Sequence, residues 1–142
     1  MDFATGLTTQ RGYAATMVKD ANTFCNIGIN SIKKKKFDYK TSYNIMCMSA
    51  EKYLVAYLLS KNIQPADHNL SGLVHEIELI DDMPRLMLLR MVEYMESFLD
   101  LCSLEILEQK SISDDEMLKL EQSLLYIREF SEAAVLGRTT LS

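Results

Sequence analysis

The sequence contains few of the residues that interrupt helices. Only seven of its 142 residues are glycine or proline, five and two respectively, and tryptophan is absent. Glycine and proline thus make up about 5% of the chain, compared with roughly 12% in average proteins. Because both residues break regular structure, their scarcity predicts long, uninterrupted helices. The remaining composition, 48% apolar and 25% charged, argues against a disordered or fibrous chain.

Long apolar runs are also missing. The longest, Tyr53 to Leu59, has seven residues, whereas a membrane-spanning helix needs about 20. The first residues, MDFATGLTTQR, include an early aspartate and no apolar stretch, which is unlike a secretory signal. We therefore expect a cytoplasmic protein without a membrane segment. Its length is typical of one domain, so residues 1–142 are expected to form a single domain with a frayed tail at about 138–142.

Cysteine and histidine are too scattered for the common metal and cofactor sites. The three cysteines, Cys25, Cys47 and Cys102, form no CxxC pair, so we expect reduced core residues. Neither His68 nor His75 follows a glutamate by three residues, as a di-iron bundle would require. No G-x-x-x-x-G-K phosphate loop is present. We expect no metal, no cofactor and no catalytic residue of these types.

Charge is distributed unevenly along the chain. Residues 1–75 carry nine basic and five acidic side chains, a net +4, while residues 76–142 carry six and fifteen, a net −9. A net acidic chain repels nucleic-acid backbone, and no DNA-binding motif is present. The basic run Lys33–Lys36, followed by Lys40, suits a solvated helix C-terminus. A contact with an anion or a partner is the alternative for this run.

The spacing of apolar residues predicts an all-α fold. These residues recur at intervals of three and four, the period of an amphipathic helix. The predicted helices cover about Thr9–Lys35, Tyr39–Lys61, Leu70–Ile80, a segment that follows Asp82 with Pro84 in its first turn and runs to Cys102, and a last helix from Ser113 to Gly137. Ser113 and Glu116 match a capping box, and Gly137 is a suitable helix stop. We expect an up-and-down antiparallel bundle of four to five helices, with the second helix at its centre.

The second and third predicted helices carry an informative residue order. The run YKTSYNIMCMSAEKYLVAYLLSKNIQPADHNLSGLVHEIE resembles the small prokaryotic HEPN proteins, whose second helix reads like A-x-x-x-A-E-K-x-L-x-A-x-L and precedes a loop with proline and a Thr-His-Asp-Leu-like turn. The matching residues are Phe37, Asp38 and Tyr39 before the helix, Ser49, Ala50, Glu51, Lys52, Leu54 and Ala56 within it, and Pro65, Asp67, His68, Asn69 and Leu70 after it. The resemblance covers about residues 18–80 closely and residues 81–142 only in topology.

The HEPN resemblance implies a homodimeric helical domain of the toxin–antitoxin kind, often paired with a small nucleotidyltransferase. Many members are ribonucleases whose signature is an arginine four to six residues before a histidine. Neither His68 nor His75 has an arginine at that spacing. RNA cleavage needs a proton acceptor and a cation near the phosphate. Arg85 or Arg90 could supply the cation, but neither has a histidine near it in sequence, so the sequence favours a non-catalytic protein.

The residues of the matched segment also have physical interpretations of their own. Small Ser49 and Ala50 suit close helix approach, with Glu51 and Lys52 at the rim as binding candidates or ordinary surface charges. Asp67 or Asn69 is expected to cap the third helix, and His68 either packs over that turn or faces a cleft. The tyrosines Tyr39, Tyr43, Tyr53, Tyr57 and Tyr94 fit a core or a dimer face better than a base-stacking surface.

Together these features predict a non-catalytic module that binds a nucleotide, RNA or a nucleotidyltransferase partner. We expect a homodimer in which the second and fourth helices meet, since Met87, Met91 and Met95 form a stripe suited to helix contact, although core packing explains that stripe almost as well. The binding candidates are Glu51, Lys52, His68, Arg90 and Tyr94. The alternatives are a divergent metal-independent ribonuclease that uses Arg90, Tyr94 or His68, and a purely structural bundle.

Overall fold

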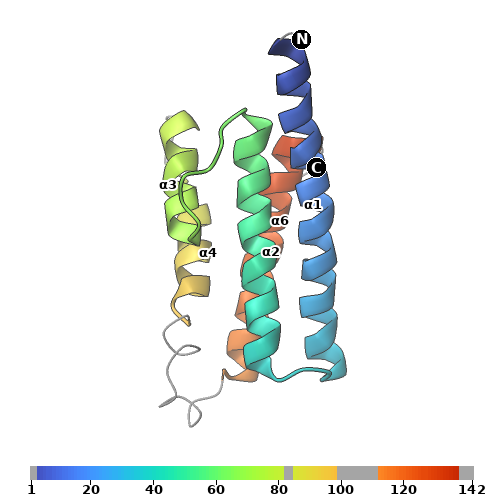
Figure 1. Cartoon of the computed structure of the whole chain (residues 1–142). Coiled ribbons are helices and arrows are strands. Elements are labelled where there is room, and N and C mark those ends of the chain that lie inside the picture. The colour runs from blue at the N-terminus through green and yellow to red at the C-terminus, as the bar shows by residue number, and fades with distance from the viewer. Residues whose placement is uncertain (1–2, 82–84, 99–111, 138–142) are drawn as a thin grey trace.

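The computed structural model describes residues 3–81, 85–98 and 112–137, which form a helical bundle (Figure 1). Its helices are α1 (Phe3–Lys34), α2 (Tyr39–Ser60), α3 (Leu70–Asp81), α4 (Leu86–Glu96) and α6 (Asp114–Leu136). The prediction of an all-α bundle is confirmed. The predicted position of Pro84 and the frayed tail lie outside the described residues. In the part of the chain that is described, no helix has the length and apolar character needed to cross a membrane.

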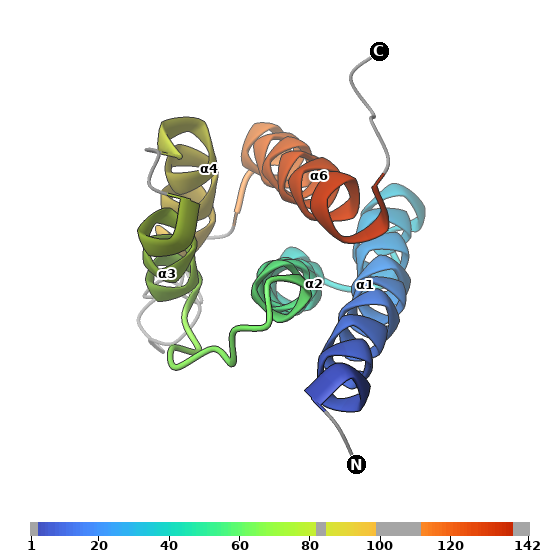
Figure 2. The same ribbon diagram turned by 90° about the horizontal axis from the view of Figure 1, so that it is seen from above.

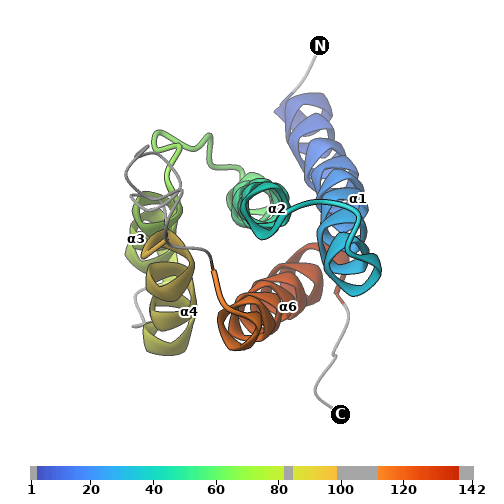
Figure 3. The same ribbon diagram turned by 90° about the horizontal axis from the view of Figure 1, so that it is seen from below.

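The helices are arranged around α2. Seen along the bundle, α1 and α6 cover two sides of α2, and the α3–α4 pair lies on the side away from α1 (Figures 2 and 3). Successive described helices run in opposite directions except α2 and α3, which run the same way because the loop from Lys61 to Asn69 returns along α2 before α3 begins (Figure 1). This return places the start of α3 beside the middle of α2. Helices α2 and α6, which also pack together, run the same way as well.

Local signals explain the start of α2 and both ends of α6. The Asp38 carboxylate accepts from the Thr41 amide, 2.8 Å away, at the start of α2. Ser113 and Glu116 form the predicted capping box of α6, and Gly137 ends that helix with a left-handed φ of 68°. Both of these α6 predictions are confirmed.

Two predicted boundaries were wrong. Helix α1 begins at Phe3 rather than near Thr9, because no proline separates the first residues from the periodic segment. Helix α4 ends at Glu96 rather than near Cys102. There the Ser97 hydroxyl donates to the Tyr94 carbonyl, 2.6 Å away, and the Ser97 amide bonds to both Glu93 and Tyr94. A serine that binds backbone in this way competes with continued helix formation.

The contact between α1 and α2 is close because small residues line it. A Cβ atom added to Gly28 would lie 2.8 Å from Met46 Cγ, so any larger residue at this crossing would force the buried Met46 side chain to move. The Ser49 hydroxyl donates to the Ala21 carbonyl at 2.8 Å, and the hydroxyls of Ser31 and Ser42 lie 2.7 Å apart. The prediction that Ser49 and Ala50 permit close helix approach is confirmed, since both are fully buried.

The core runs along α2 and takes residues from every described helix. Tyr43, Tyr53 and Tyr57 are buried in it, which confirms the core assignment of these tyrosines. The predicted methionine stripe on α4 does not face one environment, since Met95 is fully buried whereas Met87 is 48% exposed. Cys25 is fully buried, as predicted, and burial raises the pKa of its thiol. Cys102 lies outside the described residues.

Candidate functional site: a pocket between α2, α3 and α4

A pocket of about 230 Å³ opens where the return loop meets α2. Its wall comes from the middle of α2, from the loop end and first residue of α3, and from the last residue of α4. The lining residues are Cys47, Met48, Glu51, His68, Asn69, Leu70 and Glu96. Two of the candidates from the sequence, Glu51 and His68, are thus brought to one site by the parallel course of α2 and α3. Small-molecule sites are typically roughly 300–1,000 Å³, so this pocket suits a single side chain or a small group.

The loop that forms one wall of the pocket is held in place by side chains of α3. The Asn69 carboxamide oxygen accepts from the Gly72 amide at 2.7 Å, so Asn69 caps α3. Asn69 was one of the two residues predicted for this cap. The Glu76 carboxylate accepts from the amides of Ala66 and Asp67, at 3.1 and 2.9 Å. Burial alone would raise the Glu76 pKa, but these donors outweigh it and the pKa is lowered. These hydrogen bonds tie the loop wall of the pocket to α3.

Gly72 is the residue that allows the loop to lie so close to α3. A Cβ atom there would be 2.7 Å from Asp67 Cγ and 2.8 Å from Asn69 Oδ1. We expect Gly72→Ala to lower the free energy of unfolding by about 1 to 2 kcal/mol, because overpacking costs roughly 1–3 kcal/mol and alanine regains up to about 1 kcal/mol of helix propensity. Urea unfolding measures this change, and NMR signals of His68 should shift as the loop moves.

A matched control for that substitution is Gly12→Ala on α1. A Cβ atom at Gly12 would meet nothing within 4 Å, so this variant should be as stable as the parent or more stable by up to about 1 kcal/mol. If Gly72→Ala behaved like Gly12→Ala, the close approach of the loop to α3 would not matter for stability.

The other candidate residues lie outside the pocket lining. The Lys52 ammonium lies 5.4 Å from the centre of the Phe24 ring, on the α1 side of α2. Arg90 is exposed on α4. Tyr94 is half-buried against Phe98, with ring centres 5.3 Å apart, and its pKa is raised, mainly by burial. Five candidates named from sequence therefore occupy three separate surfaces.

The pocket has a mainly apolar wall with two acidic side chains at it. Glu51 and Glu96 approach it from α2 and α4, both half-buried, and neither makes a hydrogen bond or ion pair with a described residue. His68 and Asn69 add hydrogen-bonding groups, while Met48 and Leu70 add apolar surface. Unpaired carboxylates attract a positive group and repel a phosphate. Glu96 was missed in the sequence because it lies 45 positions from Glu51 and belongs to no motif.

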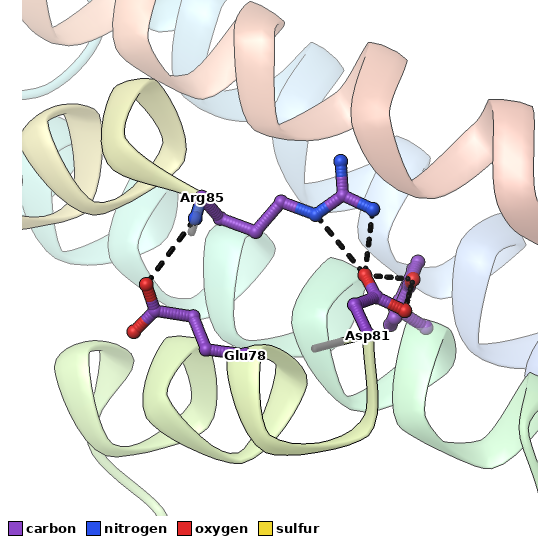
Figure 4. Close-up of polar contacts among 4 residues, drawn as sticks. Glu78, Asp81 and Arg85 are labelled. Atoms are coloured by element: carbon purple, nitrogen blue, oxygen red, sulfur yellow. Dashed lines mark hydrogen bonds and ion pairs between the residues drawn. The ribbon is translucent and has the colours of Figure 1, made fainter. Parts of the chain in front are cut away.

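A second polar cluster joins the α3–α4 corner to α2 and α6. Arg85 donates from Nε and a terminal nitrogen to one Asp81 oxygen, at 3.0 and 2.6 Å, and its amide donates to Glu78 at 3.2 Å (Figure 4). The Tyr57 hydroxyl also bonds Asp81, at 2.7 Å. Burial would raise the Asp81 pKa, but these donors and the Arg85 charge lower it. The Arg85 guanidinium lies 5.4 Å from the Phe130 ring centre, so the cluster connects α2, α3 and α6 at the start of α4.

A third polar cluster lies inside the bundle between α1, α2 and α6. Glu132 is 6% exposed and accepts from Arg128 Nε at 3.1 Å and from Asn22 Nδ2 at 3.3 Å. The Tyr53 hydroxyl donates to Asn22 Oδ1, and burial raises the Tyr53 pKa. Every one of these polar groups has a partner, as a buried polar network requires. Both clusters are packed structural contacts, and neither was predicted from the sequence.

Neither a metal-binding cluster nor a similarity to known proteins identifies a ligand for the pocket. The described ranges contain no group of three or more histidine, cysteine, aspartate or glutamate side chains placed to hold a metal ion. Comparison of the chain with family models, with curated proteins and with solved structures finds no match in any of the three.

Proposed function

We propose that this chain is a non-catalytic binding module of the cytoplasm, active as a homodimer, whose pocket between α2, α3 and α4 receives a positively charged group of a protein partner. The observation that carries the proposal is the meeting of Glu51 and Glu96 with His68 and Asn69 around one small pocket. A lysine or arginine side chain has the size, charge and donor groups that such a lining satisfies.

The charge of the lining decides between the ligands expected from the sequence. A nucleotide or RNA brings negative phosphate, which the carboxylates of Glu51 and Glu96 disfavour. A protein partner can instead place one basic side chain in the pocket and bury apolar surface around Met48, which is 48% exposed. The HEPN resemblance supports the same conclusion, since it suggests a nucleotidyltransferase as the partner. The fixed loop lowers the ordering cost of binding.

Titration of the protein with three probes tests this function. The probes are a short lysine-rich peptide, ATP and a short single-stranded RNA, and binding is followed by calorimetry and by the NMR signals of His68. We expect the peptide to bind and to shift the His68 signals. Glu51→Gln and Glu96→Gln should each weaken peptide binding about ten- to hundredfold, because a charge-assisted hydrogen bond contributes roughly 1.5–3 kcal/mol.

A charge-matched control and two contrary outcomes make this test decisive. Glu129→Gln removes the same charge from an exposed position on α6, and should leave peptide affinity within about twofold of the parent. Binding of ATP or RNA that persists in Glu51→Gln would overturn the partner assignment. Shortening of the RNA, lost in His68→Ala with the fold retained, would replace the proposal with a ribonuclease.

A further inference from the structure

The outward face of α4 is an open surface with an unusual composition. Its exposed positions are Leu86, Met87, Arg90 and Glu93, with Tyr94 half-exposed beside them. Leu86 is 57% exposed and Met87 48%, so two large apolar side chains face outward at adjacent positions of this helix. The helix stands at the edge of the bundle on the side away from α1 (Figure 2). None of these residues lines the pocket, to which α4 contributes only Glu96, so the face is a separate surface.

Arg90 and Glu93 are the two charges of this face, and neither is paired. The ion pairs between described residues are Arg85–Asp81 and Arg128–Glu132, so both side chains are available. Residues three apart lie within one turn on the same side of a helix. Their opposite signs make the face self-complementary: in an antiparallel pair of α4 helices, each arginine meets the other copy's glutamate, and both pairs form at once.

From this complementarity we infer that α4 is the dimer face, packing antiparallel against α4 of a second copy with Arg90 opposite Glu93 in both directions. The inference rests on the homodimer of the proposed function and specifies its interface. In the same register Met87 and Tyr94 of the second copy are offset by two residues, about 3 Å along the helix axis, which is within reach of a sulfur–aromatic contact.

Of the two helices expected at the interface from sequence, α4 fits better than α2. Helix α2 packs against α1, α3 and α6, which surround most of it. Buried residues lie on several sides of α2, for example Tyr43, Ser49 and Leu59. Among the described residues, helix α4 packs along α3 and α6 and touches α2 near its C-terminal end, where the Tyr43 hydroxyl donates to the Met95 carbonyl. Its opposite side stays open.

Charge reversal tests this arrangement, with native mass spectrometry and sedimentation of the full chain as readouts. We expect the parent protein to be a dimer. R90E and E93R should each raise the dimer dissociation constant by about a hundredfold or more, because each places like charges opposite one another twice. The double variant R90E/E93R restores both pairs with signs exchanged and should dimerise again. An equimolar mixture of the two single variants should form a heterodimer.

A control and the contrary outcomes separate this inference from the proposed function. K119E changes charge at an exposed position of α6 and should leave the dimer intact. If both single variants remained dimers, α4 would not be the interface, although the homodimer itself would stand. A monomeric parent would overturn both the interface and the homodimer, while binding of the lysine-rich peptide to the pocket would still be measured independently.

Discussion

Replacing Glu132 with alanine is expected to lower the free energy of unfolding by about 3 kcal/mol. Removing one member of a buried ion pair costs roughly 3–5 kcal/mol because the other charge is left without compensation. The Glu132 side chain is 8% exposed and that of Arg128 is 31% exposed. Since Arg128 keeps some contact with water, the lower end of the range applies. The measurement is urea unfolding followed by circular dichroism.

The effect of that substitution extends beyond one ion pair. Glu132 also accepts from Asn22, which in turn accepts from the Tyr53 hydroxyl. Without the carboxylate, the Asn22 amide loses its acceptor at the junction of α1 and α6. A buried donor without a partner costs roughly 1–3 kcal/mol unless water replaces the lost group. The expected loss is therefore larger than for a surface pair, whose contribution is at most about 1 kcal/mol.

Two further variants make the Glu132 result interpretable. Glu129→Ala changes an exposed residue of the same helix and should alter the free energy of unfolding by no more than about 0.5 kcal/mol. The double variant Glu132→Leu with Arg128→Met removes both charges and should recover most of the loss, because apolar replacement of a buried pair is often neutral. A Glu132→Ala protein as stable as Glu129→Ala would contradict the role of this network.

Helix ends could be predicted from sequence wherever the signal is local. The capping box of Ser113 and Glu116, and the stop at Gly137, are contained in a few adjacent residues, and the structure has both. The start of α3 follows from Asn69 in the same way. Local signals failed at the start of α1 and the end of α4, where Thr9 and the apolar pattern up to Cys102 suggested boundaries that the structure does not share.

The candidate site could be predicted only in part, for a physical reason. Glu51 and His68 lie 17 positions apart, within one segment that resembles a known family, and they do meet. Glu96 completes the pocket from a different helix, and Asn22 bonds Glu132 across 110 positions. Such contacts depend on the direction and packing of whole helices. Apolar periodicity identifies which side of a helix is buried, but not which distant polar residue it meets.

The polar cluster at the α3–α4 corner should make stability fall steeply in alkaline solution. Burial, the hydrogen bond to Asp81 and the Asp81 charge raise the pKa of Tyr57 to about 12, compared with about 10 in an unfolded chain. The folded state then holds this proton more tightly. Its contribution to the free energy of unfolding is fully present below about pH 10 and is lost as pH rises to about 12. Two pKa units correspond to about 2 to 3 kcal/mol.

Tyr57→Phe isolates this contribution from those of other groups that titrate at high pH. At neutral pH the variant should be about 1 kcal/mol less stable, since it lacks the hydrogen bond to Asp81. Between pH 10 and 12 the parent loses stability that the variant cannot lose, so the two curves of unfolding free energy against pH should cross. Tyr126→Phe, at an exposed position of α6, should stay parallel to the parent. If the unfolding free energies of Tyr57→Phe and the parent ran parallel between pH 10 and 12, ionisation of Tyr57 would not contribute to the alkaline loss of stability.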